Sequence, residues 1–164
     1  MEIKVKYHNP NCKFEFIDKG EWIDLRSSET IHFDAPHLNE DGSIKFDFKL
    51  IPLGFSMELP EGFEAWIVPR SSTFKTWWII QTNHKGIVDK TYSGNNDIWR
   101  LPALAFNQST IFVGEKVCQF RIMPSQKASI WTKIKWLFTN NIKFVEVDDL
   151  QNADRGGFGT TGKK

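Results

Sequence analysis

The stretch Ile44-Lys45-Phe46-Asp47-Phe48-Lys49-Leu50 alternates strictly between apolar and charged side chains. Successive side chains of a β-strand point to opposite faces, so the alternation predicts a strand with one face on a core. Similar runs recur at 3–7, 13–17, 63–68, 76–82, 111–113, 117–123 and 142–147. Turn-forming residues separate these runs, among them Pro52, Gly54, Pro102 and Gly114. Many short strands at this spacing predict an all-β barrel or sandwich.

The length and composition of the chain indicate a single domain. With 164 residues, of which 40% are hydrophobic, the chain can bury one sizeable core but not two. We expect a β domain over 1–150 and a flexible tail or lid over 151–164, because the tail is rich in glycine and has few apolar side chains to pack.

Charge and cysteine usage argue against several classes of function. Lys and Arg number 21 against 20 Asp and Glu, so no global field favours nucleic acid or an acidic membrane surface. Cys12 and Cys118 are too few for a disulfide framework and wrongly spaced for a zinc site. No apolar run approaches the roughly 18 residues of a transmembrane helix. We therefore expect a reduced, cytoplasmic protein that binds neither nucleic acid nor membrane.

The segment 129–138 departs from the period of two and predicts a helix. Its apolar residues on one side are Ile130, Ile134, Leu137 and Phe138. Trp131 and Trp136 widen the apolar surface beyond that of an ordinary solvent-facing helix. Two interpretations stay open: the helix covers a barrel end or subunit contact, or it is a docking surface for another protein.

Two stretches carry residues suited to a ligand. The stretch 86–94 sets Asp89 and Tyr92 between two glycines, as in a short hairpin whose exposed groups meet a ligand. Arg70 stands beside two serines, which together can grip an anion or simply precede a helix as its cap.

The tail 154–164 is a third candidate. Its glycines allow close approach of backbone N–H groups, its Arg and Thr side chains suit phosphate oxygens, and Phe158 offers a flat face to a base. The composition fits a polyphosphate ligand, and it fits a disordered tail equally well.

Together these elements resemble, in order, the five motifs of the homotrimeric dUTP pyrophosphatases (dUTPases). The matching segments are 23–25, 69–72, Asn83 with 86–94, 114–119 and 155–162. Trp22-Ile23-Asp24-Leu25 and Asn96-Asp97 are most similar to the form found in Gram-positive bacteria and their phages. The resemblance implies a jelly-roll-like β subunit and a homotrimer in which each active site is assembled from all three chains.

The resemblance also implies a reaction, the hydrolysis of dUTP to dUMP and pyrophosphate, which keeps uracil out of DNA and supplies dUMP for thymidylate synthesis. Asp89 would be the general base that deprotonates a water for attack on the α-phosphorus. Tyr92 would lie under the deoxyribose and exclude a 2′-hydroxyl. Asn83 and the backbone of Gly86 and Ile87 would pair with the uracil edge.

Phosphate and metal roles follow from the same resemblance. The residues that would hold the phosphates are Arg70, Ser71, Ser72 and Gln119, and those that would close over them from a neighbouring subunit are Arg155, Gly159, Thr160 and Thr161. Phe158 would stack on the base, with Trp99 as second choice. Asp24 would touch Mg²⁺ through water, because Mg²⁺ keeps part of its hydration while it bridges phosphates.

Two alternatives remain. A dCTP deaminase shares the fold and an Arg-Ser-Ser stretch, but it needs a glutamate base directed at the pyrimidine ring, and Asp89 with Tyr92 argues against it. The stretch 125–141 is longer than dUTPases usually carry, and some phage dUTPases bind repressor-like partners through inserted segments. We therefore expect 125–141 to be a candidate surface for a protein partner.

Overall fold

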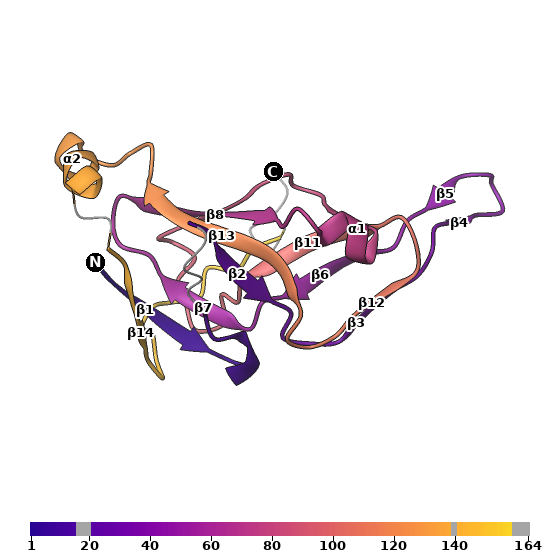
Figure 1. The fold of residues 1–164 in the computed structure, drawn as a ribbon, viewed down its shortest axis with the longest axis horizontal. Coiled ribbons are helices and arrows are strands. Elements are labelled where there is room, and N and C mark those ends of the chain that lie inside the picture. Colours follow the sequence, from indigo (N-terminus) through magenta and orange to yellow (C-terminus); the bar gives the residue numbers. More distant parts are fainter. Residues whose placement is uncertain (16–20, 139–140, 159–164) are drawn as a thin grey trace.

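The computed structural model describes residues 1–15, 21–138 and 141–158. Gly159, Thr160 and Thr161 lie outside these residues. Short strands dominate the described chain, as Figure 1 shows, and the prediction of an all-β fold is confirmed. No helix in the described part of the chain is long and apolar enough to cross a membrane.

The strands form three larger sheets and two separate pairs over the described residues. The first sheet has the order β14 (Lys143–Glu146), β1 (Glu2–Tyr7), β7 (Phe55–Glu58), and only its β1–β14 pairing is parallel. The second has the order β10 (Gly86–Asp89), β8 (Phe63–Pro69), β13 (Lys116–Pro124), β2 (Ile23–Arg26). The third has the order β6 (Phe48–Pro52), β11 (Arg100–Ala105), β9 (Ile79–Gln81). The two pairs are β12 (Ser109–Ile111) with β3 (Ile31–Phe33) and β4 (His37–Leu38) with β5 (Ile44–Lys45).

Aromatic rings from different sheets meet in the core. Phe55 of β7 lies 4.9 Å from Trp99 between ring centroids, and Trp99 lies 5.4 Å from Phe120 of β13. All three side chains are fully buried. The edge-on geometry of the Trp99–Phe120 pair is one that aromatic rings favour. The core therefore fixes Trp99, the last residue of the segment between β10 and β11.

The predicted helix over 129–138 is confirmed as α2 (Ile130–Phe138). It lies at one end of the molecule, and the β4–β5 pair projects at the opposite end (Figure 1). The helix touches the barrel through Trp136, whose ring packs edge-on against Phe63 at 5.4 Å. Trp131, Leu137 and Phe138 are 76%, 77% and 82% exposed. Within one chain, α2 therefore leaves most of its apolar surface uncovered.

The predicted single strand over 44–50 is wrong, because the chain divides it into β5 and β6. Ile44 belongs to the projecting pair and Phe48 begins a strand of the third sheet, and both side chains are exposed. The alternation correctly indicated extended backbone, but the apolar face of the run 44–50 does not lie on the core of this chain.

Three other expectations need correction. The run 76–82 begins inside helix α1 (Thr73–Trp77), which ends where Trp78 adopts a left-handed conformation with φ of 55°, and only β9 is strand. In the run 13–17, residues 13–15 have no regular structure and 16–17 lie outside the described residues. The stretch 86–94 is not a hairpin: its first half is β10, which pairs with β8, and its second half is turn and loop.

Candidate active site

A pocket of about 260 Å³ lies between β10, the loop after it and the C-terminal segment. Several predicted site residues line it together, namely Asn83, Gly86, Ile87, Tyr92, Arg155 and Phe158. They come from two segments about seventy positions apart in the chain, which only the folded structure brings together. Their roles in binding stay predictions, but their convergence on one pocket is a structural fact.

The β10 strand supplies one wall of the pocket. It pairs antiparallel with β8, with Gly86 opposite Ile67 and Asp89 opposite Glu64, and has no second neighbour among the described strands. An edge strand keeps alternate N–H and C=O groups free for a ligand. A Cβ atom on Gly86 would lie 3.3 Å from Ile67 Cβ, so the wall is packed tightly from behind.

The Tyr92 ring is held at the side of the pocket. Its hydroxyl donates a hydrogen bond of 3.0 Å to the Ile98 carbonyl. Burial and the charge of Asp97 raise the pKa of Tyr92, so the phenol stays protonated and keeps this bond. A Cβ atom on Gly157 would lie 3.3 Å from the ring, so the C-terminal segment passes directly against Tyr92.

Asp89 is not part of the pocket lining but directly follows Val88, which is, and its side chain is 53% exposed. Its Oδ1 accepts hydrogen bonds from the Thr91 amide at 2.8 Å and hydroxyl at 2.5 Å, and lies 3.5 Å from Arg155 Nη1. Burial acts to raise the pKa of Asp89, but the Thr91 hydrogen bonds and the charges of Arg155 and Lys127 outweigh it and lower that pKa. The carboxylate is therefore ionised and open to water.

The loop after Tyr92 grips the start of the tail. Asp97 is 1% exposed and accepts hydrogen bonds from the backbone amides of Gly94 at 2.9 Å, Arg155 at 2.9 Å and Gly156 at 2.8 Å. Asp154 in turn accepts from the backbone and side-chain nitrogens of Asn96 at 2.8 and 2.7 Å. We call these contacts between 94–97 and 154–156 the tail clamp.

The tail clamp joins two segments of the same chain. A Cβ atom on Gly94 would lie 2.2 Å from Asp154 Oδ1, so only glycine allows the two segments to approach this closely. The family resemblance implies that Arg155 and Phe158 serve a neighbouring subunit, whereas here they line the pocket of their own chain.

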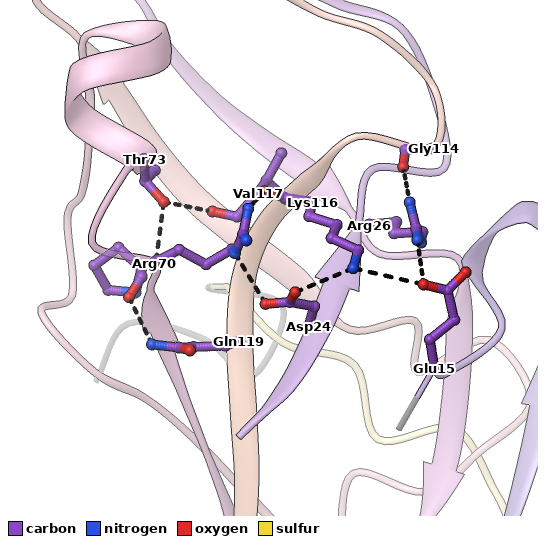
Figure 2. Close-up of polar contacts among 10 residues, drawn as sticks. Glu15, Asp24, Arg26, Arg70, Thr73, Gly114, Lys116, Val117 and Gln119 are labelled. Carbon is purple, nitrogen blue, oxygen red and sulfur yellow. Dashed lines mark hydrogen bonds and ion pairs between the residues drawn. The ribbon is translucent and has the colours of Figure 1, made fainter. Parts of the chain in front are cut away.

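Arg70 and Gln119, two of the predicted phosphate ligands, lie in a second cluster of polar contacts (Figure 2). Arg70 Nε lies 2.9 Å from Asp24 Oδ1, and its Nη1 donates to the Lys116 carbonyl at 3.1 Å. Lys116 Nζ lies 3.3 Å from the other oxygen of Asp24. Gln119 Nε2 donates to the Pro69 carbonyl at 3.3 Å. Ser72 precedes α1, but its side chain makes no capping hydrogen bond, so it is not explained as a helix cap.

The two clusters lie toward opposite ends of β8. Asp89 is opposite Glu64 near the start of that strand, and Arg70 directly follows its last residue, Pro69. At about 3.3 Å per residue, these positions are roughly 20 Å apart along the strand. The pocket lining does not include Arg70, Ser71, Ser72 or Gln119, and it does not include Asp24.

A family model described as dUTPase matches residues 18–162. The chain belongs to the dUTPase family. The SPbeta prophage-derived deoxyuridine 5′-triphosphate nucleotidohydrolase YosS of Bacillus subtilis is 44% identical over 166 residues, with 100% of both chains covered. A deoxyuridine 5′-triphosphate nucleotidohydrolase of Finegoldia magna is 30% identical over 167 residues, with 99% of each chain covered.

Solved dUTPase structures share the fold. The dUTPase from Streptococcus mutans matches with a TM-score of 0.64 and 18% identity, over 79% of this chain and 99% of that one. The dUTPase of Staphylococcus bacteriophage 80alpha matches with a TM-score of 0.62 and 15% identity, over 78% and 93%. The sheets described above thus form the jelly-roll fold of the dUTPase family, as predicted.

Asp24 does not fit a direct metal ligand in this family member. Both of its oxygens already face cations, at 2.9 Å and 3.3 Å. Among the described residues, no group of three or more His, Cys, Asp or Glu side chains is arranged to hold a metal ion. The contact of Asp24 with Mg²⁺ through water stays a prediction.

Trp99 cannot serve as a lid. It lines the pocket from the core side and is 1% exposed, so it forms a fixed floor. Sequence reasoning did not single out Thr91, Lys116 or the anchoring role of Asp97. The nearest available signal was the position of Asp97 within the segment shared with the Gram-positive dUTPase form.

Proposed function

We propose that this dUTPase family member hydrolyses dUTP to dUMP and pyrophosphate. The observation that carries the proposal is the convergence of Asn83, Tyr92 and Arg155 on one pocket, with the ionised Asp89 next to it, 3.5 Å from Arg155 Nη1. The dCTP deaminase alternative has no comparable support, because the matching family model is that of dUTPase. A cytoplasmic location for this activity is part of the proposal.

The nucleoside end of dUTP fits the geometry of the pocket. The uracil edge would meet Asn83 and the free backbone groups of Gly86 and Ile87, which line the pocket at the open edge of β10. Tyr92 would lie against the deoxyribose, since its ring is fixed by the bond to Ile98. Phe158 would cover the base from the tail side of the pocket. A pocket that binds its substrate through buried hydrogen bonds discriminates sharply against nucleotides that cannot form them.

The chemical step uses Asp89 as general base. The carboxylate would orient a water and take one of its protons as the water oxygen bonds to the α-phosphorus. The bond from the α-phosphorus to the bridging oxygen breaks in the same step, and pyrophosphate leaves with its electron pair. Oδ1 is occupied by Thr91, whereas no described residue donates to Oδ2, which suits Oδ2 for contact with the water.

The phosphates would be held by a neighbouring copy of the chain in a homotrimer. Arg70, Ser71, Ser72 and Gln119 are the proposed phosphate ligands. Arg70 and Asp89 lie toward opposite ends of β8, which favours a site in which they act on one triphosphate from different copies. Gly159, Thr160 and Thr161 are proposed to close over the phosphates.

Mg²⁺ is the proposed companion ion of the triphosphate. One similar solved structure, of the dUTPase from phage phi11 of S. aureus, is described as revealing the coordination of a structural Mg(II) ion. In this chain Lys116 and Arg70 already neutralise Asp24, so we assign the ion no direct protein ligand.

A pyrophosphate-release assay with dUTP, UTP, dTTP and dCTP tests the proposed function. We expect release from dUTP alone, and a loss of about a hundredfold or more in kcat for Asp89→Asn, with nucleotide binding retained. Asp148→Asn, the same change at an exposed carboxylate, should leave the rate unchanged. Ammonia release from dCTP without pyrophosphate release from dUTP would establish the deaminase instead.

A protein-binding role is a second candidate, favoured by the exposed apolar surface of α2. The 80alpha dUTPase structure is described as part of work on phage dUTPases that control transfer of virulence genes. We propose that residues 125–141 contact a protein partner through Trp131 and Leu137, which are 76% and 77% exposed. Trp131→Glu with Leu137→Glu should abolish capture of that partner and leave dUTP hydrolysis intact, whereas capture that survives would exclude this surface.

A further inference from the structure

A buried amide side chain stands directly behind Asn83. Gln81 is the last residue of β9 and is 6% exposed. Its Nε2 donates one hydrogen bond to the Ile67 carbonyl at 3.1 Å and another to Asn83 Oδ1 at 2.7 Å. Both acceptor residues line the pocket. Gln81 therefore joins β8 to a side chain that lines the pocket.

The Gln81 amide occupies its site at an energetic disadvantage. Its Oε1 is buried and has no hydrogen-bond partner. An unpaired buried acceptor is unfavourable, and an apolar side chain of the same length would avoid the penalty. The two bonds that Nε2 donates are the interactions that an apolar residue could not supply.

The backbone determines how both amides are oriented. The Ile67 carbonyl can only accept a hydrogen bond, so the end of Gln81 that faces it must be the NH₂ group. The same nitrogen faces Asn83, which must therefore present its oxygen to Gln81. The Asn83 Nδ2 group is left on the other side of its amide, and no described residue accepts a bond from it. The result is a donor of defined orientation in the lining of the pocket.

We propose that Gln81 is a positioning residue that holds Asn83 as a hydrogen-bond donor to the O4 carbonyl of the pyrimidine. This inference rests on the proposed function, because it assumes that the pocket receives uracil. Uracil has an acceptor at position 4, whereas cytosine carries an amino donor there. Both bases have an acceptor at O2, and a donor at position 3 would favour cytosine, whose N3 accepts, so a donor of defined orientation favours uracil only at position 4. Gln81 thus contributes to the preference for dUTP over dCTP.

Two substitutions test this role. Gln81→Met keeps the length of the side chain and removes both donated bonds. Gln81→Glu keeps its shape, but the oxygen that it turns toward Asn83 accepts and draws Nδ2 away from the pocket. We expect each variant to raise KM for dUTP with little change in kcat, to lower kcat/KM about tenfold to a hundredfold, and to reduce the dUTP:dCTP ratio of kcat/KM.

Coupling to Asn83 distinguishes positioning from general support of the fold. In an Asn83→Ala chain, Gln81→Met should have no further effect on the ratio, because its effect acts through Asn83. Gln108→Met, at an exposed glutamine away from the pocket, is the matched control and should change nothing. A lower melting temperature with an unchanged substrate ratio would overturn the inference.

The wild-type protein in the same assay shows whether the proposed function fails or only the positioning role of Gln81 fails. If it releases no pyrophosphate from dUTP, the proposed function fails. If it does so and both Gln81 variants keep the wild-type ratio, only the positioning role of Gln81 fails.

Discussion

At the scale of single residues, the neighbours of Asp89, the proposed base, keep its carboxylate ionised. Its Oδ1 is committed to Thr91, and nearby cations stabilise its charge. The lowered pKa means that Asp89 is ionised at neutral pH and stays so into the acid range. Such a base is weak in proton affinity, so the proposed catalysis depends mainly on the placement of the water and the charge around the phosphates.

Arg155→Ala should shift the acid limb of the pH profile. Arg155 lies 3.5 Å from Asp89 and lowers its pKa, so its removal raises that pKa and moves the acid limb of kcat/KM to higher pH. The pH dependence of kcat/KM for dUTP measures this shift. Lys75→Ala, at an exposed site on α1, is the control and should leave the acid limb unchanged. A reduced rate with an unmoved limb would mean that Arg155 acts on the substrate alone.

At the scale of elements, the tail clamp gives the C-terminal segment a defined place without regular secondary structure. Asp97 accepts hydrogen bonds from consecutive backbone amides at Arg155 and Gly156. A buried carboxylate surrounded by donors makes bonds that are stronger than those between neutral groups. The clamp sets the direction in which Arg155 and Phe158 leave the loop, and both then reach the pocket.

Asp97→Asn should loosen the tail. The amide would place an NH₂ group against backbone donors, so at least one bond of the clamp is lost. We expect faster trypsin cleavage after Arg155, measured by mass spectrometry, and a lower kcat/KM for dUTP. Asp148→Asn is the matched control, since its carboxylate is exposed and precedes the tail. Equal cleavage rates in the two variants would show that Asp97 does not hold the tail in solution.

At the scale of the whole molecule, the proposed base and the proposed phosphate ligands lie apart within one chain. The positions of Asp89 and Arg70 are separated along β8 by roughly 20 Å. Exposed apolar side chains also remain on the third sheet and α1, among them Phe48, Ile80 and Phe74. Surfaces of this kind are typical of contacts between subunits.

Mixing two inactive variants should restore activity. Asp89→Asn and Arg70→Ala subunits, refolded together in equal amounts, would form some sites with an intact Asp89 from one copy and an intact Arg70 from another. Random assembly gives about a quarter of wild-type activity, because each half is intact in about half of the positions. Each variant refolded alone is the control. A mixture that stays inactive, or a protein that sediments as a monomer, would contradict the shared site.

The fold class and the pocket residues were predictable to different extents. The period-two pattern identified β8 and β13 because one side of each strand lies on the core. It misplaced the run 44–50, since side chains that face away from the core of one chain show the same alternation. Asn83, Tyr92 and Asp89 were predicted from motifs. Gln81 was not, because a glutamine that is buried in a strand cannot be distinguished by sequence from one that faces solvent.

The order of residues by itself determined that the chain is all-β, that a helix follows β13, and that Asp89 and Tyr92 stand close together. These are local properties of period, turn chemistry and short spacing. Only the tertiary structure decided that the tail meets the loop 94–97, that Asn83 presents its oxygen to Gln81, and that Arg70 lies far along β8 from Asp89. The reason is that each depends on backbone groups distant in sequence, and folding alone sets the distances between them.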